Sequence, residues 1–432
     1  MSKTQHEAVL VKVKEGYKET KLGWIPEDWS VKLLDELGEF SKGKGIAKKD
    51  VLEDEIDGLP CIRYAEIYTI YHYNTTALKS KINQESSENS NPIGRGDILF
   101  AGSGETLEDI GKSIAYFGEQ TAYAGGDIII LKQNHQDSRY LGYLFNNDVV
   151  KNQLFKIGQG HSVVHIYSSG LKKVLVPLPP LPEQQKIASI LNIWDKAIAA
   201  QEKLILEKQE LKKGLMQQLL TGKKRFRGFT EEWEVKPMND IVKYLGGEAF
   251  KSTSQVENGV KWLKIANVGI GSVKWNNSTT FLPTSFIEKN PKYVLKEGDI
   301  IMALTRPILN NKLKIATFNK EDGIALLNQR VAKLTSKNKN DLKFIYYLHQ
   351  MPYFIYCMNV MMAGTDPPNI SLKDLSKTKV TIPNYDEQKM IVSIIESFDF
   401  EIDNLIDIKE QIINQKQGLM QQLLTGEKRV KI

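Results

Sequence analysis

Two long segments of the chain, residues 183–222 and 387–426, carry apolar residues at alternating steps of four and three. Spacing of that kind, sustained for about five heptads, is typical of helices that pair in a coiled coil. Prolines precede both segments, and Gly222 and Gly426 follow the last apolar residues, where helix-ending glycines belong. The apolar positions expected to pair are Ile187, Leu191, Trp194, Ile198, Ile205, Leu215, Leu219, Ile391, Ile395, Phe398, Ile402, Leu405, Ile412, Leu419 and Leu423.

Each predicted helix must bury its apolar face, either against the other helix or against a neighbouring globular block. At ~1.5 Å rise per residue, a helix of about 39 residues is roughly 58 Å long, which exceeds the span of one block of ~150 residues. We therefore favour pairing of the two helices. The path of the chain favours an antiparallel pair, because a block must fit between the end of the first helix and the start of the second.

The two segments belong to a tandem duplication. The sequence Gly-Leu-Met-Gln-Gln-Leu-Leu-Thr-Gly occupies residues 214–222 and recurs, letter for letter, at 418–426, an offset of 204 residues. The offset also relates Trp29 to Trp233, and a Glu-Gln pair at 183–184 recurs at the same distance. The chain therefore consists of two halves, each a variable block followed by a better-matched tail.

The variable blocks, 23–182 and 228–383, have the patterns of mixed β-strands and short helices. Short apolar runs bounded by Gly, Pro or charged residues predict strands at 97–100, 127–131, 174–176 and 299–302. Aromatic residues and leucines at helical spacing predict helices at 138–155 and 340–358. Each block is long enough to hold its own core, and residues 1–22 form an N-terminal arm.

Composition narrows the class of protein. The chain of 432 residues has 58 Lys and Arg against 52 Asp and Glu, a net charge of +6, which permits a polyanionic partner without requiring one. Its two cysteines, Cys61 and Cys357, cannot build a disulfide framework or a four-cysteine zinc site. No apolar run reaches the ~18 residues of a membrane span, and the first residues lack a signal-peptide core. We therefore expect a cytoplasmic protein.

One segment imitates a methyltransferase motif. Residues 100–104 fit F-x-G-x-G, the loop that holds S-adenosylmethionine, but a short Gly-rich loop is weak evidence alone. An amino-methyltransferase also needs an Asn/Asp-Pro-Pro-aromatic tetrad. The nearest candidate, 366–369, ends in Asn369 and lies in the other repeat. A self-contained DNA methyltransferase is therefore a disfavoured alternative.

Other catalytic motifs are incomplete. Residues 111–113 resemble the end of a Walker A loop, but Thr106 stands where the loop needs glycine. His161 and His165 have helical spacing without Cys or acidic neighbours at metal-ligand positions. We predict no catalytic residue, no metal site and no cofactor in this chain.

The remaining candidate residues suit DNA. Lysines on the Gly-containing loop 41–49 suit phosphate contacts, arginine is the commonest reader of guanine, and asparagine or glutamine reads adenine. A solvated loop or a surface ion pair explains each residue equally well by itself, so only the set argues for DNA. The candidates are Lys42, Lys44, Lys48, Lys49, Arg63, Tyr64, Lys112, Lys251, Lys264, Asn267, Arg306, Arg330 and Asn369.

These features together resemble the specificity subunit of type I restriction–modification systems. The residues that carry the resemblance are 176–187 and 213–222, with second copies at 382–391 and 418–426, and the block entrances at 23–29 and 228–233. The resemblance covers residues 20–432. Residues 383–386 have fewer prolines than the family pattern, and the loop 161–166 lacks the Pro-Asn of 368–369, which leaves open that the two loops serve differently.

The resemblance implies an α+β fold with two β-rich target recognition domains in tandem repeat, separated by two long helices that pair as an antiparallel coiled coil. It implies a non-catalytic subunit whose domains each read one half of a bipartite, asymmetric site in double-stranded DNA. Half-sites about one helical turn, roughly 34–36 Å, apart lie on one face of the duplex.

The same resemblance implies partners. Two modification subunits would bind along the outer helix faces and supply S-adenosylmethionine, and two restriction subunits would add ATP- and Mg-dependent translocation and cleavage. A twofold repeat offers two similar docking surfaces, as two copies of a partner require. A structural rod that joins two protein-binding domains is the other alternative to DNA recognition.

Overall fold

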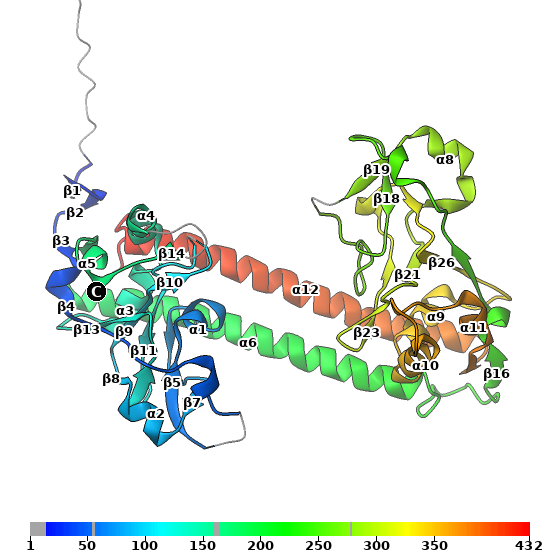
Figure 1. The fold of residues 1–432 in the computed structure, drawn as a ribbon, viewed down its shortest axis with the longest axis horizontal. Helices are drawn as coiled ribbons and strands as arrows, with labels where there is room; N and C mark the ends of the chain where they lie inside the picture. The colour runs from blue at the N-terminus through cyan, green and yellow to red at the C-terminus, as the bar shows by residue number, and fades with distance from the viewer. Residues whose placement is uncertain (1–13, 54–56, 107, 159–163, 277–278) are drawn as a thin grey trace, which may run out of the picture. The chain divides into compact units, whose positions relative to one another are not determined.

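The computed structural model describes residues 14–53, 57–106, 108–158, 164–276 and 279–432 (Figure 1). Most of the predicted N-terminal arm, and His161, lie outside the described residues. The chain divides into two compact units: the first unit comprises Met1–Glu202 and Asp407–Ile432, and the second unit comprises Lys203–Ile406. Each unit therefore contains one variable block and half of each long helix.

The first unit is built on two sheets. The larger has five strands in the order β4 (Gly38–Lys42), β13 (Ile128–Gln133), β9 (Ile98–Ala101), β11 (Ser113–Tyr116) and β6 (Asn74–Thr75). The smaller has the order β7 (Ser80–Ile82), β5 (Leu59–Ile62), β12 (Ala122–Ala124) and β8 (Asn91–Ile93). The other described strands of this unit form two-stranded pairs. They are β1 (Tyr17–Thr20) with β2 (Gly23–Pro26), β3 (Ser30–Leu33) with β15 (Leu175–Leu178), and β10 (Ser103–Gly104) with β14 (Val164–His165).

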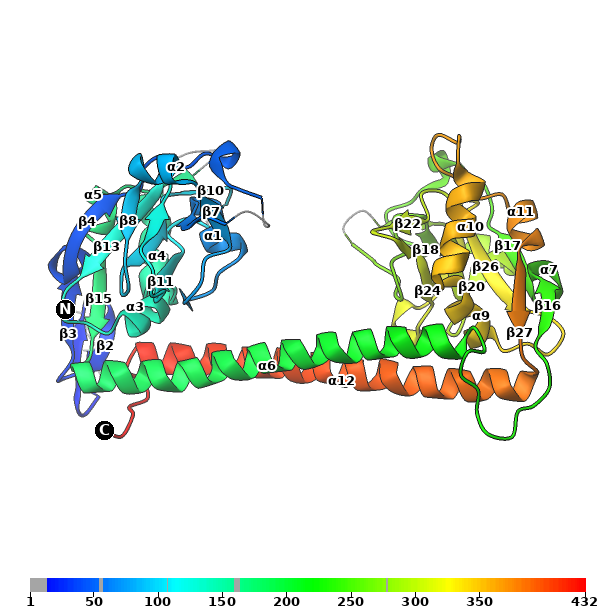
Figure 2. The ribbon, with the colours of Figure 1, turned by 90° about the horizontal axis from the view of Figure 1, so that it is seen from below.

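The second unit repeats this arrangement. Its larger sheet has the order β17 (Val242–Gly246), β26 (Val331–Ser336), β21 (Ile300–Ala303) and β24 (Ile315–Thr317). Its second sheet has the order β19 (Thr280–Leu282), β18 (Val260–Leu263), β25 (Ala325–Leu327) and β20 (Val294–Leu295). The other described strands of the second unit also form two-stranded pairs: β16 (Glu234–Pro237) with β27 (Lys379–Ile382), and β22 (Ile308–Leu309) with β23 (Lys312–Leu313). Figure 2 shows β16 beside β27. The duplication in the sequence is therefore a duplication of topology.

Short helices pack on the sheets. In the first unit they are α1 (Tyr64–Thr69), α2 (Gln84–Glu88), α3 (Ser138–Leu144), α4 (Asp148–Ile157) and α5 (Ser168–Leu171). In the second unit they are α7 (Met238–Ile241), α8 (Ser285–Lys289), α9 (Leu342–His349), α10 (Pro352–Met362) and α11 (Leu372–Lys377). The short 3₁₀ turns within the described residues are η1 (Leu34–Leu37), η2 (Lys48–Asp50), η3 (Ser252–Ser254), η4 (Pro291–Tyr293) and η5 (Lys320–Asp322).

The four predicted strands are confirmed as β9, β13, β15 and β21, but the predicted helices 138–155 and 340–358 are wrong as single elements. Each is two helices. Asn147 begins α4 because its side-chain oxygen accepts a hydrogen bond from the Val149 amide at 3.1 Å. Pro352 begins α10, where its missing N–H costs nothing. These two residues are start signals inside a continuous apolar pattern.

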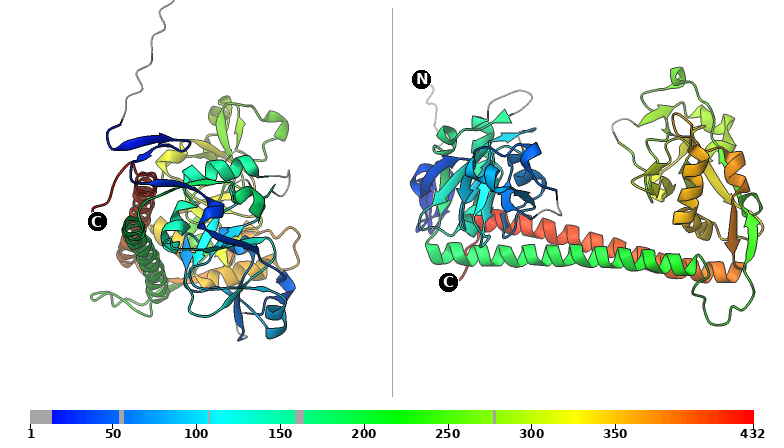
Figure 3. Two further views of the ribbon diagram at one scale, coloured as in Figure 1. Left: turned by 90° about the vertical axis from the view of Figure 1, so that its left-hand side faces the viewer. Right: turned by 60° about the horizontal axis from the view of Figure 1, so that its bottom comes forward.

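The two long helices are α6 (Leu181–Leu219) and α12 (Tyr385–Leu424). In the first unit the beginning of α6 lies beside the end of α12, and in the second unit the end of α6 lies beside the beginning of α12, so the pair is antiparallel (Figure 3). Every position predicted for the apolar stripes is buried or half-buried.

The helices also pack on the blocks. In the first unit, Leu191 and Leu423 belong to one hydrophobic core with Trp29 and Phe100. In the second unit, Leu219 shares a core with strand and helix residues of the second block. Packing on the partner helix and packing on the neighbouring block were alternatives in the sequence, and the ends of the helices do both.

Candidate nucleic-acid interface

In the second unit, three of the predicted DNA contacts meet on one edge of the larger sheet. The backbone amide of Leu304 donates to the carbonyl of Arg330 at 2.9 Å. The hydroxyl of Thr305 donates to Oδ1 of Asn369 at 2.8 Å, and Arg306 follows directly. We call residues 304–306, 328–330 and 368–369 the second rim.

The second rim presents hydrogen-bond donors to solvent. Arg306 and Arg330 are both exposed, and neither makes an ion pair within the part of the chain that the structure describes. The backbone of Arg306 has a φ of 46°, a left-handed conformation uncommon for arginine, and its amide donates to the carbonyl of Pro368 at 2.8 Å. The loop therefore holds its guanidinium-bearing residue in place through the backbone.

The first unit has an equivalent edge. The amide of Gly102 donates to the carbonyl of Asp127 at 2.7 Å, and the amide of Ile166 donates to the carbonyl of Gly102 at 2.9 Å. Ser103 Oγ lies 2.8 Å from Nδ1 of His165. We call residues 102–103, 125–127 and 165–168, with Lys42, the first rim.

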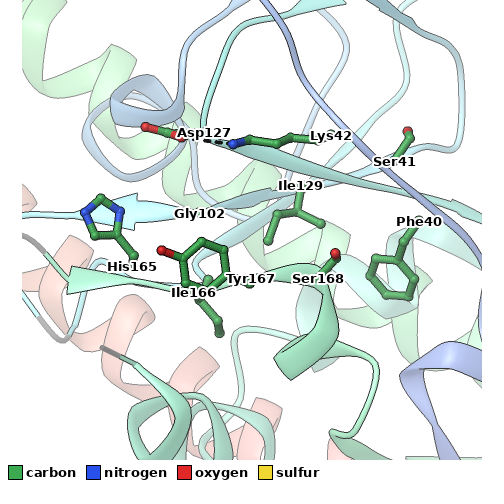
Figure 4. A pocket seen from close by; sticks show the side chains of 10 residues that line it. All are labelled: Phe40, Ser41, Lys42, Gly102, Asp127, Ile129, His165, Ile166, Tyr167 and Ser168. Carbon is green, nitrogen blue, oxygen red and sulfur yellow. Dashed lines mark ion pairs between the residues drawn. The ribbon is translucent and has the colours of Figure 1, made fainter. Parts of the chain in front are cut away.

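The first rim encloses a cavity of about 190 Å³ (Figure 4). Lys42 and Asp127 line one side of it, with 3.6 Å between Nζ and Oδ1, and His165 and Tyr167 line another. The ion pair is solvent-exposed and therefore weak, so both charged groups stay available to a ligand. Sequence reasoning missed Asp127, Ser103 and Tyr167, and it considered His165 only as a metal ligand, a role that it rejected.

The lysine loop beside this rim has a fixed backbone. A Cβ on Gly43 would lie 2.0 Å from the carbonyl oxygen of Gly125, so only glycine fits at this close approach. The amide of Lys44 donates to the carbonyl of Ala124 at 3.0 Å. The side chains of the four predicted lysines of this loop are exposed: Lys42, Lys44, Lys48 and Lys49.

Two half-buried lysines occupy equivalent places beside the two rims. The carbonyl of Lys112 accepts from Ala101, and that of Lys314 accepts from Ala303, each at 2.9 Å and next to its rim. Burial lowers the pKa of both ammonium groups, and the charge of Lys151 lowers that of Lys112 further. Sequence reasoning found Lys112 and missed Lys314. The two lysines are nevertheless equivalent in the repeat, because they are separated by the same number of residues as the matching segments 96–98 and 298–300.

The remaining candidates differ in what the structure leaves available. The Arg63 guanidinium pairs with Glu66 at 3.2 Å, and Tyr64 begins α1 directly after it. Lys264 Nζ lies 4.0 Å from the centre of the Trp262 ring, and burial lowers its pKa. Lys251 is exposed.

Asn267 has a structural role that sequence reasoning did not foresee. Its side chain is 5% exposed, its Oδ1 accepts from the amide of Lys264 at 2.9 Å, and its Nδ2 donates to the carbonyl of Lys274 at 3.1 Å. Because both polar atoms already serve the loop, we withdraw Asn267 from the candidate DNA contacts.

The motifs that imitate enzymes are built into the sheets. The F-x-G-x-G segment runs from β9 into β10, where Ser103 and Gly104 pair with β14, so it is a strand and not an open cofactor loop. Ser113 of the Walker-like segment lies in β11 with its amide bonded to Asn146 at 3.3 Å. Among the residues that the structure describes, no three His, Cys, Asp or Glu side chains gather as metal ligands, and no helix is long and apolar enough to cross a membrane.

Comparison with known proteins places this repeated, helix-joined fold among DNA-specificity proteins. Residues 26–209 and 230–415 each match the model of the type I restriction modification DNA specificity domain. The chain therefore belongs to the family of type I restriction–modification specificity subunits.

Individual relatives agree. The chain is similar to the type I restriction enzyme MjaVIII specificity subunit of Methanocaldococcus jannaschii, with 34% identity over 96% of this chain and 97% of the relative. A putative MjaX specificity subunit from the same organism is 30% identical over 96% of this chain and 97% of its own length. The S subunit structure from M. genitalium shares the fold, with a TM-score of 0.53 at 15% identity over 92% of this chain and 96% of that chain.

Proposed function

We propose that each of the two blocks reads one half of a bipartite, asymmetric site in double-stranded DNA. The observation that carries this proposal is the pair of rims, which share one backbone arrangement but present different side chains. Two different readers require two different half-sites. Family membership supports DNA as the partner.

The chain contributes recognition, and its partners contribute chemistry. Exposed lysines beside the first rim suit phosphate contacts, which position a protein on a duplex and make its affinity fall with salt. Modification subunits bring S-adenosylmethionine, and restriction subunits bring ATP- and Mg-dependent translocation and cleavage. The chain itself catalyses nothing and acts in the cytoplasm as part of this complex.

The long helices set the length of the unread gap and dock the partners. Large apolar side chains remain exposed on them: Ile193 (63%) in the first unit, and Leu206 (63%), Leu211 (56%) and Phe400 (71%) in the second. An exposed apolar side chain on a helix gains by burial against another protein. Because the repeat offers two similar helix surfaces, two modification subunits and two restriction subunits bind one chain.

The test is to express the chain together with the modification subunit of the same system and to map methylated adenines in the host genome. We expect a single split motif, with two specified half-sites and an unspecified gap of constant length. A complex that binds duplexes without sequence preference, with an affinity governed by salt alone, would support the structural-rod alternative instead.

The methyltransferase alternative has its own test. The purified chain, incubated alone with DNA and labelled S-adenosylmethionine, should transfer no methyl group. Transfer that is lost when Gly104 is changed to Val would place catalysis in this chain and overturn the division of labour proposed above.

A further inference from the structure

The two rims have the same hydrogen-bonded frame. The bond from Gly102 to Asp127 (2.7 Å) in the first unit corresponds to the bond from Leu304 to Arg330 (2.9 Å) in the second. His165 and Asn369 occupy equivalent positions, and the residue after each one bonds back to the end of the strand. The amide of Ile166 donates to the carbonyl of Gly102, and the amide of Ile370 donates to the carbonyl of Leu304. These bonds use only backbone atoms, so they hold the loops in place whatever the side chains are.

The side chains on this frame differ in charge and in hydrogen-bonding capacity. Asp127 occupies the place of Arg330, which reverses the charge. His165 occupies the place of Asn369, and each contacts the hydroxyl residue opposite it at 2.8 Å. By strand register, Lys42 at the end of β4 corresponds to a glycine at the end of β17.

We propose that the position pairs 127/330 and 165/369 are the base-reading positions that make the two half-sites different. This inference rests on the proposed function and deepens it. A carboxylate accepts a hydrogen bond from the amino group of cytosine, arginine donates two to guanine, and asparagine exchanges two with adenine. Asp127 therefore favours cytosine in the half-site of the first unit, and Arg330 and Asn369 favour guanine and adenine in the other.

The cavity of the first rim gives this assignment a geometric basis. Its lining includes Asp127, His165 and Tyr167, so a base edge inserted there meets an acceptor, an imidazole and an aromatic face (Figure 4). Tyr167 is 58% exposed although it is a large aromatic residue, and a stacking partner would cover it.

The lysines that recur identically serve the other part of recognition. Lys112 and Lys314 have the same residue type, the same backbone bond to the strand beside the rim and a side chain bonded to a carbonyl. A half-buried ammonium group without a carboxylate bonded to it suits a phosphate, which is present at every DNA sequence. These lysines position the duplex and provide matched controls, because their loss weakens binding without altering the bases read.

The experiment uses the complex of the full chain with its modification subunits and a randomised duplex library. The exchange variants are His165→Asn and Asn369→His, each of which places one unit's residue on the other unit's frame. We expect His165→Asn to change the bases preferred in one half-site only, with a shift in discrimination of roughly 10- to 100-fold at the affected base pair. Asn369→His should change the other half-site, and the gap should stay constant.

A second pair of substitutions tests the same proposal in case the exchange variants misfold. Asp127→Asn keeps the size of the side chain and tolerates the φ of 58° at this position, and Arg330→Gln alters an exposed residue. Lys112→Gln and Lys314→Gln should lower affinity while leaving the motif intact.

The outcomes separate the two proposals. If the unaltered complex shows a split motif and all four rim variants retain it, the base-reading positions lie elsewhere and this inference fails. If the unaltered complex shows no split motif, the proposed function itself fails. A motif changed by Lys112→Gln as strongly as by His165→Asn would also overturn the separation of base-reading and phosphate-binding residues.

Discussion

The two units differ at their rims and agree where they hold the long helices. At each junction a buried glutamate near the start of a long helix receives hydrogen bonds from a tryptophan and an arginine, with N···O distances between 2.7 and 3.2 Å. The members are Trp29, Glu183 and Arg429 in the first unit, and Trp233, Glu387 and Arg225 in the second. Residues 204 apart thus keep both identity and contact at the junctions.

A second repeated cluster lies between the helices. Lys416 pairs with Asp195, which also accepts from the Tyr143 hydroxyl, in the first unit. Lys212, Asp399 and Tyr347 form the same cluster in the second. The comparison teaches that the duplicated chain keeps the residues that hold each block to the helix pair, whereas it varies the rim residues that we propose face DNA. Charge reversal at the rims is tolerated because the rim frame is made of backbone bonds.

The largest expected effect comes from breaking a helix junction. Leu219→Asp and Leu423→Asp, at equivalent positions that are each 2% exposed, should each destabilise the chain by about 4–5 kcal/mol, because an unpaired carboxylate would enter a core. Denaturant unfolding measures this loss. Leu211→Asp, at a position that is 56% exposed, is the control and should change stability by about 0.5 kcal/mol or less. An equal loss at Leu211 would show that the wrong helix face is buried.

The second effect depends on pH and separates the units. His349 is buried, its Nε2 lies 2.8 Å from the Tyr244 hydroxyl, and burial lowers its pKa to about 4. In the unfolded chain the His349 imidazole binds a proton near pH 6.5, whereas in the folded unit it stays neutral until about pH 4. The free energy of unfolding therefore falls as the pH drops from about 6.5 to about 4, by about 3 kcal/mol at most.

Phe145 is the buried residue of the first unit that corresponds to His349, and it suggests the substitution for a control variant. His349→Phe should remove the loss of stability between about pH 6.5 and 4. The measurement is the denaturant midpoint as a function of pH. An unchanged pH profile in the His349→Phe variant would contradict the assignment of this titration to the second unit.

A third effect compares the two equivalent ion pairs between the long helices, which differ in exposure. Lys416→Met leaves Asp195 without its cation, and we expect a loss of about 2–3 kcal/mol because the lysine side chain is only 4% exposed. Lys212→Met should cost less, about 1 kcal/mol, because Lys212 and Asp399 are 17% and 40% exposed and water screens the pair. Equal losses in thermal unfolding would show that exposure does not distinguish the two clusters.

The smallest effect on stability is expected at the first rim. Lys42→Met removes a pair whose side chains are 68% and 48% exposed, so stability should change by about 0.5 kcal/mol or less. If Lys42 contacts a phosphate, the slope of log affinity against log salt should fall by about one in DNA titrations of the assembled complex. An unchanged salt slope would remove Lys42 from the interface.

Local spacing in the sequence was sufficient for the two long helices, for the strands β9, β13, β15 and β21, and for the duplication. The stripe of apolar residues specified α6 and α12 to within a few residues of their ends, because helix formation depends on residues three and four apart. The same kind of signal failed at Asn147 and Pro352, where one residue begins a new helix inside an apolar run.

The tertiary structure alone decided which distant residues meet. Lys208, Lys212, Lys409 and Lys416 interrupt the apolar stripes in the sequence, and each pairs with an acidic residue on the other long helix. In the same way, only the folded sheets bring Arg306, Arg330 and Asn369 onto one rim and bury both polar atoms of Asn267. Periodicity is a property of neighbours along the chain, whereas an ion pair or a binding rim depends on the closure of loops tens to hundreds of residues long.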